Sequence, residues 1–241
     1  MKRFLDILLA GPALLLLLPL LAVIGAAVWM EDRGSPWYRG VRVGRGGREF
    51  RMWKFRSMRV GAAKSGVRST ACGDARVTGV GRILRSSKLD ELPQLWHVVK
   101  GEMSLVGPRP QVPEEAALYT REEVSMFQVR PGITDLASIV FADEGEILAG
   151  SGDPDLLYNQ LIRPWKSRLA LLYVDKSSWT LDARILMWTA AALISRRWAL
   201  ERIGKLLEAW GVGEPLLGMA RRAAPLVAYP PPGAGAVVKI A

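Results

Sequence analysis

The sequence predicts a mixed, helix-rich α/β protein with an N-terminal membrane segment and a small cytoplasmic domain. Three observations carry this prediction: an uncharged run over residues 7–30, an alternating stretch within residues 35–60, and later segments with helical periodicity. The chain has 241 residues, is half hydrophobic and carries a formal net charge of +10, which argues against both disorder and an ordinary soluble enzyme. We expect a membrane helix over residues 1–30, one domain over 31–195, and an amphipathic helix with a disordered tail over 196–241.

The apolar run is long enough for a membrane, because 24 helical residues at about 1.5 Å each exceed the roughly 30 Å of a bilayer core. Lys2 and Arg3 precede the run, and the thirty residues from Glu31 carry nine basic side chains against three acidic ones, so both ends favour the cytoplasm. A helix bent at Pro19 can enter and leave through one leaflet, since proline removes a backbone hydrogen bond. The alternatives are a simple kinked span and a cleaved signal peptide, which the length of the run disfavours.

Residues 35–60 predict a hairpin, because apolar and polar side chains roughly alternate after a Gly-rich turn. This turn lacks the spacing of known nucleotide-binding loops and is given no nucleotide role. Residues 61–75, rich in Gly, Ser, Ala and Arg, predict a mobile loop. The single Cys72 excludes an intrachain disulfide, and one His with one Cys argues against a zinc site of the usual ligands.

Two adjacent carboxylates, Asp90 and Glu91, precede a segment with helical periodicity. Pro93 fits only the first turn of that helix, and Gly101 is a typical stop. We therefore expect both carboxylates at a helix N-terminus, where free N–H groups and the macrodipole favour negative charge and keep Asp90 ionised. Ordinary capping is the alternative for such a pair taken alone. An ionised aspartate can also act as a nucleophile.

Basic residues surround this pair in the sequence. Arg82, Arg85 and Lys88 come just before it, and Arg109 lies between two prolines in a rigid Gly107–Pro110 loop. Arginine suits phosphate recognition because its planar fork can bind two oxygens at once. Carboxylates and arginines in this arrangement favour a site that handles phosphate groups.

The stretch KLDELPQLWHVVKGEMSLVGPRP, residues 88–110, closely resembles the signature of bacterial membrane-bound sugar transferases. These are the monotopic phosphoglycosyl transferases that start glycan assembly on a polyprenol carrier. The resemblance extends to Lys2–Asp6, Lys54–Met58 and Arg130–Thr134 in the family's order, and it covers roughly residues 1–195.

The resemblance implies that Asp90 attacks the β-phosphorus of a nucleoside diphosphate sugar, with Mg²⁺ held by Asp90 and Glu91. A covalent phosphosugar would pass from Asp90 to polyprenol phosphate, the first membrane step of exopolysaccharide, O-antigen or glycoprotein glycan assembly, with a UDP-sugar expected as the donor. The implied setting is the cytoplasmic face of the bacterial inner membrane, where the re-entrant helix contacts membrane lipids. The residues expected to contact the diphosphate are Lys54, Arg56, Arg85, Arg109 and Arg130.

Two departures from the family pattern leave the carboxylate chemistry intact and the sugar and base open. Asp135–Ser138 replaces the usual Gly, apolar residue, Ala and Gln, and His97 stands where Asn is usual. The polyprenol length and the oligomeric state, a homo-oligomer included, also stay open.

The rival interpretation is a non-catalytic basic membrane adaptor that holds anionic lipids or assembly proteins. Nucleic acid is disfavoured as a partner, since the basic residues follow a membrane segment and lack a reading element. Residues 200–210 have helical periodicity and suggest a basic amphipathic helix on the membrane surface.

Overall fold

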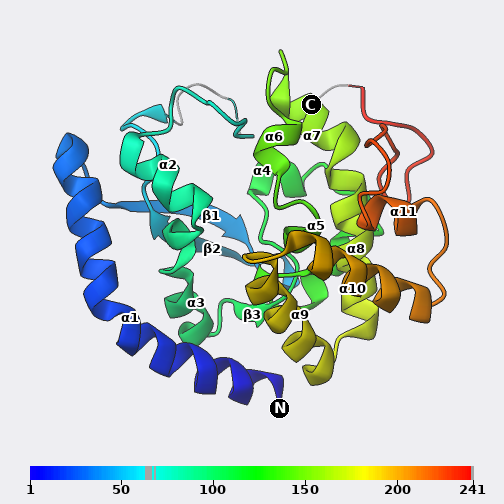
Figure 1. The fold of residues 1–241 in the computed structure, drawn as a ribbon, viewed down its shortest axis with the longest axis horizontal. Coiled ribbons are helices and arrows are strands. Elements are labelled where there is room, and N and C mark those ends of the chain that lie inside the picture. The colour runs from blue at the N-terminus through cyan, green and yellow to red at the C-terminus, as the bar shows by residue number, and fades with distance from the viewer. Residues whose placement is uncertain (63–66, 68, 240–241) are drawn as a thin grey trace.

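A long N-terminal helix, two small sheets and a set of shorter helices make up the described part of the chain (Figure 1). The computed structural model describes residues 1–62, 67 and 69–239. Residues 63–66 and 68, which fall in the loop predicted over 61–75, lie outside the described residues. The mixed, helix-rich α/β class expected from the sequence is confirmed.

The first helix, α1, spans Lys2–Asp32 as one helix of 31 residues. Within the described ranges it is the helix long and apolar enough to cross a membrane. It bends in its middle part (Figure 1), and Pro12 and Pro19 both lie inside it. The face turned away from the body leaves large apolar side chains exposed: Phe4, Ile7, Leu8, Leu9, Leu15, Leu16, Leu18, Leu20, Val23, Trp29 and Met30.

Both halves of α1 pack on the body. Ala10, in the first half, joins a buried cluster with Met52, Leu95, Val98 and Met103. The second half joins another cluster, whose buried members are Leu21, Ile24, Val28, Phe55 and Leu84. The inward face of the helix is therefore part of the core along its length, while the outward face has no protein partner in the described chain.

Polar contacts fix the N-terminal end of α1. The Lys2 ammonium donates to the hydroxyl of Tyr173 at 2.9 Å and pairs with the carboxylate of Asp182. Asp6 is buried and accepts a hydrogen bond from the Ser104 hydroxyl at 3.0 Å. A buried carboxylate needs such donors to offset its lost hydration. These contacts join residues about a hundred or more positions apart and hold the helix end in place.

A hairpin follows α1, as the sequence predicts. Strands β1 (Trp37–Val43) and β2 (Glu49–Phe55) pair antiparallel, and a short 3-10 turn, η1, joins them at Arg45–Gly47. Gly46 lies at φ 69°, a left-handed conformation that glycine adopts without steric cost. The fully buried Phe55 stacks on Trp37 with ring centroids 4.9 Å apart.

A second, two-stranded sheet joins two segments that carry predicted site residues. β3 (Ser104–Val106) runs parallel to β4 (Gly132–Thr134). The backbones then approach so closely that a Cβ on Gly132 would lie 2.1 Å from the amide nitrogen of Gly107. Gly132 begins β4, and only glycine fits this close backbone contact.

The remaining helices form the body beyond the hairpin (Figure 1). Most of their buried side chains make one large cluster, with Trp165, Leu136 and Ile185 among its fully enclosed members, whereas Leu84, Leu95 and Val98 belong to the two clusters shared with α1. The segments are α2 (Gly79–Ser86), η3 (Leu89–Glu91), α3 (Gln94–Lys100), α4 (Pro113–Ala116), η4 (Glu123–Gln128), α5 (Leu136–Val140), α6 (Glu144–Ile147), α7 (Pro154–Leu161), α8 (Arg163–Lys176), α9 (Trp179–Ala192), α10 (Arg196–Ala209) and α11 (Leu216–Ala220).

The C-terminal region differs from the sequence expectation. The apolar face of α10 is buried in the large cluster, so the structure does not leave it free for a membrane surface. The segment after α11 also packs on the body: Tyr229 stacks on Trp165 at 4.3 Å, and the Gln160 amide donates to the carbonyl of Val238 at 2.8 Å. The proline-rich run Pro230–Gly233 predicts disorder, yet the order of the segment comes from contacts with distant residues.

Candidate active site

Asp90 and Glu91 lie in the 3-10 turn η3, directly before α3. Lys88 starts the turn in a left-handed conformation at φ 58°, and Pro93 sits at the cap position of α3. The predicted helix therefore begins after the carboxylates and not with them, because Pro93 fits a helix start. Its predicted stop is confirmed, since Gly101 ends α3 at φ 91°.

Glu91 is paired with Arg109. The guanidinium approaches in a fork, with Nη1 3.0 Å from one carboxylate oxygen and Nη2 in contact with the other. Burial alone would raise the pKa of Glu91, but the charge and hydrogen bonds of Arg109 lower that pKa to about 2. The same pairing raises the pKa of Arg109. The pair is thus a fixed ionic unit beside Asp90.

Asp90 is the opposite of its neighbour. Its side chain is buried, and its carboxylate has no hydrogen bond or ion pair among the described residues, where burial and nearby charges alone act on it. Burial and then the charge of Glu91 raise the pKa of Asp90, while Lys54, Arg85 and Arg109 oppose the rise. The sequence predicted that a helix N-terminus would favour ionisation, but desolvation outweighs it here. Neighbouring charges therefore shift the pKa of the Asp90 carboxylate, but no residue of the described chain holds it in an ion pair or hydrogen bond.

Two further cations face the same carboxylates. Lys54 lies on β2, and burial lowers its pKa to about 8 although Asp90 and Glu91 favour its charged form. Arg85, near the end of α2, reaches the Ser57 hydroxyl at 3.4 Å, and its charge acts on Asp90. The fold thus gathers three of the predicted basic residues, from β2, α2 and the loop after β3.

The other two predicted phosphate ligands lie elsewhere. Arg56 binds both carboxylate oxygens of Asp32, each at 2.6 Å, and fixes the end of α1. Arg130 donates through Nε to the carbonyl of Gly101 at 2.9 Å, at the C-terminal end of α3. Asp90 and Glu91 lie before the N-terminal end of this helix, so the structure does not bring Arg130 to them. Both contacts depend on tertiary neighbours that motif spacing does not reveal.

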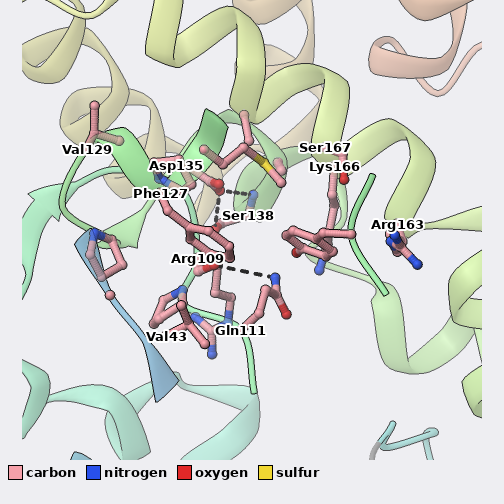
Figure 2. A pocket seen from close by; sticks show the side chains of 18 of the residues that line it. Val43, Arg109, Gln111, Phe127, Val129, Asp135, Ser138, Arg163, Lys166 and Ser167 are labelled. Atoms are coloured by element: carbon pink, nitrogen blue, oxygen red, sulfur yellow. Dashed lines mark hydrogen bonds between the residues drawn. The ribbon is translucent and has the colours of Figure 1, made fainter. Parts of the chain in front are cut away.

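A pocket opens beside Arg109 (Figure 2). Apolar side chains such as Phe127 and Val129 line it together with the polar side chains of Asp135, Ser138 and Lys166. Asp135 caps α5 by accepting hydrogen bonds from the amide and the hydroxyl of Ser138, both at 2.6 Å. The departure from the family pattern at Asp135 therefore lies in the wall of a pocket next to the Glu91–Arg109 pair.

Sequence reasoning missed Lys166 and Gln94. Lys166 lines the pocket and pairs with Glu144. Its sequence distance from the motif around Asp90 gave no sign that it would lie near this site. Gln94 is 1% exposed, and neither atom of its amide has a partner in the described chain. Its position four residues after Asp90 was the available signal, because residues at this spacing share a helix face.

His97 departs from the family pattern, and both of its ring nitrogens have partners. Its Nδ1 lies 2.6 Å from a Glu102 carboxylate oxygen, and its Nε2 accepts a hydrogen bond from the backbone amide of Trp53 at 2.9 Å. With Nε2 accepting, the ring proton is on Nδ1 and is donated to Glu102. His97 thereby ties α3 to β2, the strand that carries Lys54.

The sequence of this chain matches those of known proteins. The bacterial sugar transferase family model matches residues 1–196. A UDP-glucose:undecaprenyl-phosphate glucose-1-phosphate transferase of Caulobacter vibrioides is 41% identical over 141 residues, covering 57% of this chain and 53% of the relative. A protein of the same name from Xanthomonas campestris pv. campestris is 37% identical over 204 residues, covering 82% and 40%.

A third relative carries a different sugar in its name. The UDP-N-acetylgalactosamine-undecaprenyl-phosphate N-acetylgalactosaminephosphotransferase of Aeromonas hydrophila is 41% identical over 142 residues, 58% of this chain and 34% of the relative. The chain spans about a third to a half of the length of these three relatives. Since the family model covers most of the chain and includes the Asp90–Glu91 turn, the chain belongs to the bacterial sugar transferase family.

Proposed function

We propose that this protein transfers a sugar 1-phosphate from a nucleoside diphosphate sugar, with UDP-sugar as the expected donor, to a polyprenol phosphate. The observation that carries the proposal is the contrast within one turn: Glu91 is fixed by Arg109, whereas Asp90 is buried and has no partner among the described residues. The names of the relatives support a donor of this class and undecaprenyl phosphate as acceptor. Such a transfer would be the first membrane step of exopolysaccharide, O-antigen or glycoprotein glycan assembly.

The proposed reaction has two steps. First, a carboxylate oxygen of Asp90 forms a bond to the sugar-linked phosphorus, and the bond from that phosphorus to the bridging oxygen breaks, so that the electron pair leaves with UMP. Second, an oxygen of polyprenol phosphate attacks the same phosphorus, and the bond to Asp90 breaks. The carboxylate is regenerated and the product is a polyprenyl diphosphate-sugar.

Like charges oppose the first step, because a carboxylate must approach an anionic diphosphate. Arg85 and Lys54 lie where their charges act on Asp90, so they would also stabilise phosphoryl oxygens placed there. Arg109 is shared with Glu91, which fixes the direction of its guanidinium. These side chains are positioned before substrate binds, and their stabilisation needs no reorganisation during the reaction.

The dyad fits Mg²⁺. The ion is commonly held by one or two carboxylates together with substrate phosphates, and Asp90 with Glu91 offers that set. No cluster of three or more His, Cys, Asp or Glu side chains suited to a metal occurs in the part of the chain that the structure describes. Phosphate oxygens would therefore complete the ligands. When bound, the ion would neutralise charge on the diphosphate.

The arrangement of α1 supports a re-entrant membrane helix. Lys2 at one end contacts Asp182, and at the other end the Glu31 carboxylate accepts from the amide of Gly79 at 2.7 Å. Both ends thus touch one folded body, whereas a straight helix of 31 residues would separate them by about 46 Å. The bent helix would dip into the cytoplasmic leaflet of the inner membrane, and the body would stay on the cytoplasmic face.

Labelling of cysteines tests this topology. In a Cys72→Ser background, a cysteine added before Met1 and a separate Ser35→Cys variant should both resist an impermeant reagent applied to intact cells. Both should react after the cells are opened. Labelling of either position from outside would exclude re-entry.

The catalytic proposal is tested by incubating the purified full chain in lipid nanodiscs with Mg²⁺, undecaprenyl phosphate and a panel of labelled UDP-sugars. One of these sugars should appear in the lipid fraction with release of UMP. Without acceptor, the protein should release about one equivalent of UMP and retain sugar label on the peptide that contains Asp90.

The variants separate the two carboxylates. Asp90→Asn should abolish both UMP release and labelling, whereas Glu91→Gln should slow the release and leave the label on Asp90. Label on Glu91 would exchange the two roles. Normal turnover with lipid but no release without it would exclude the covalent intermediate, and full activity of Asp90→Asn would sink the proposal.

A further inference from the structure

Gln94 poses a problem of stability that its surroundings do not solve. It is the first residue of α3, it is 1% exposed, and neither Nε2 nor Oε1 makes a hydrogen bond with any residue of the described ranges. A buried polar group without a partner lowers the stability of the fold, and an apolar side chain of similar shape would avoid that cost. An unpaired amide in this place needs a reason.

The position of Gln94 suggests the reason. Helical side chains lean toward the N-terminus of their helix and cover the preceding turn, which here is the turn holding Asp90. Three residues later, His97 accepts a hydrogen bond from the backbone amide of Trp53, so this face of α3 is turned to β2. Lys54, whose charge acts on Asp90, is the next residue of that strand. Gln94 therefore begins the helix face that carries the His97–Trp53 contact, and it comes directly after the turn that holds Asp90.

We propose that Gln94 is a further catalytic residue, whose amide Nε2–H donates a hydrogen bond to a phosphoryl oxygen of the group transferred through Asp90. The inference rests on the proposed transfer and deepens it. A donor aimed at a phosphoryl oxygen in a site shielded from water stabilises negative charge far better than one exposed to solvent. The buried, unpaired amide is thereby explained as a group whose partner arrives with the substrate.

The chemistry also favours an amide over another cation. Arg109 shows what a cation does next to a carboxylate in this site: it pairs with Glu91 through both oxygens. A similar partner on Asp90 would hold the carboxylate that must attack phosphorus. A neutral amide binds a carboxylate more weakly than a guanidinium does, so it leaves Asp90 free and still donates to the phosphoryl group.

The test compares Gln94→Met with Gln160→Met, the same substitution at a site where the amide binds the carbonyl of Val238 far along the chain. Both are made in the full chain and assayed in nanodiscs with UDP-sugar and undecaprenyl phosphate. For Gln94→Met we expect kcat to fall at least about tenfold with KM within about threefold, because the contact forms with the reacting group. Its Tm should equal or exceed that of the wild type, since an unsatisfied amide is removed. Gln160→Met should keep both kinetic constants.

Gln94→Leu is measured in parallel, so that a folding defect of one variant does not decide the question. Lower kcat with unchanged or higher Tm in either variant supports the inference. A kcat within about twofold of wild type in both variants overturns it, and so does a loss of activity that both variants show only together with a lower Tm. Absence of transfer by the wild type would overturn the proposed function itself, which distinguishes that failure from a failure specific to Gln94.

Discussion

The two ends of α3 are built in opposite ways. At its C-terminal end, Arg3 donates to the carbonyl of Val99 at 2.6 Å and Arg130 donates to that of Gly101, so that cations meet the negative end of the helix dipole. At its N-terminal end, Asp90 and Gln94 are buried, and the described chain supplies neither with a hydrogen-bond partner. One end is satisfied by the protein alone, whereas the other has polar groups available for a ligand. In a helix of only seven residues, one end is thus held by contacts within the protein, and the other carries polar groups without a protein partner in the described chain.

Replacing Arg109 should break this comparison most strongly. Arg109→Lys keeps the charge but loses the planar fork that fixes Glu91, so kcat/KM should fall at least about tenfold, or roughly 1.4 kcal/mol of transition-state stabilisation. Steady-state UMP release at varied donor concentration measures the effect. Arg197→Lys, at a side chain that is 92% exposed, is the control and should be neutral. Activity of Arg109→Lys within about twofold of wild type would remove Arg109 from the site.

Alkaline pH should weaken the N-terminal end next. Because burial holds the pKa of Lys54 near 8, well below its usual value, Lys54 loses its proton as the pH rises through about 8 and no longer offsets charge near Asp90. If its charge is required, kcat/KM should fall about fivefold between pH 8 and pH 9, as expected for one titrating group. Lys54→Arg should move this limb to higher pH, and the exposed Lys205→Arg should not. An alkaline limb that stays in place in Lys54→Arg would assign it to another group.

Acid should reveal the stability held in the Glu91–Arg109 pair. The pKa of Glu91 is depressed in the folded protein to about 2, from its ordinary value of 4.5, so the pair stabilises the fold above about pH 4.5. This contribution is lost as the pH falls from 4.5 through 2. The Tm difference between wild type and Arg109→Met should therefore shrink as the pH falls below about 4.5. A difference that grows on acidification would contradict the pairing.

The satisfied end should show the smallest effect on catalysis. Arg130→Met removes the hydrogen bond to Gly101 and should cost about 1 kcal/mol of folding free energy, measured by denaturant unfolding. Its kcat/KM should stay within about twofold of wild type, because Arg130 lies away from the dyad. A tenfold loss of kcat/KM without loss of stability would instead return Arg130 to the phosphate site implied by the family resemblance.

Local pattern explains what the sequence could predict. The hairpin, the long apolar helix and the stop at Gly101 follow from residues near one another in the chain, and the structure confirms them. The grouping of Arg85 and Arg109 around Asp90 and Glu91 could be anticipated, because the motif is continuous and the fold keeps its parts together. The roles of these residues stay predictions.

Tertiary neighbours explain what the sequence could not predict. Burial reverses the expected direction of the pKa shift of Asp90, and no pattern within the motif states how deeply a carboxylate will be buried. Arg56 resembles a site residue until Asp32 is found beside it. The tail resembles disordered chain until Tyr229 is found stacked on Trp165, 64 positions earlier in the sequence.

Because both ends of α1 are held by the body, the number of residues between them fixes which face of the helix turns inward. Between Asp6, bound to Ser104, and Glu31, bound to the start of α2, each residue advances the chain by about 100° of rotation and 1.5 Å. One inserted residue would turn one anchor away from its partner or carry buried Ala10 to the bare side. An insertion of a whole number of turns would turn the same faces inward again but would lengthen the helix between its two anchors. The spacing of α1 is thus constrained as tightly as a register between strands, even where its outward-facing leucines have no protein partner in the described chain.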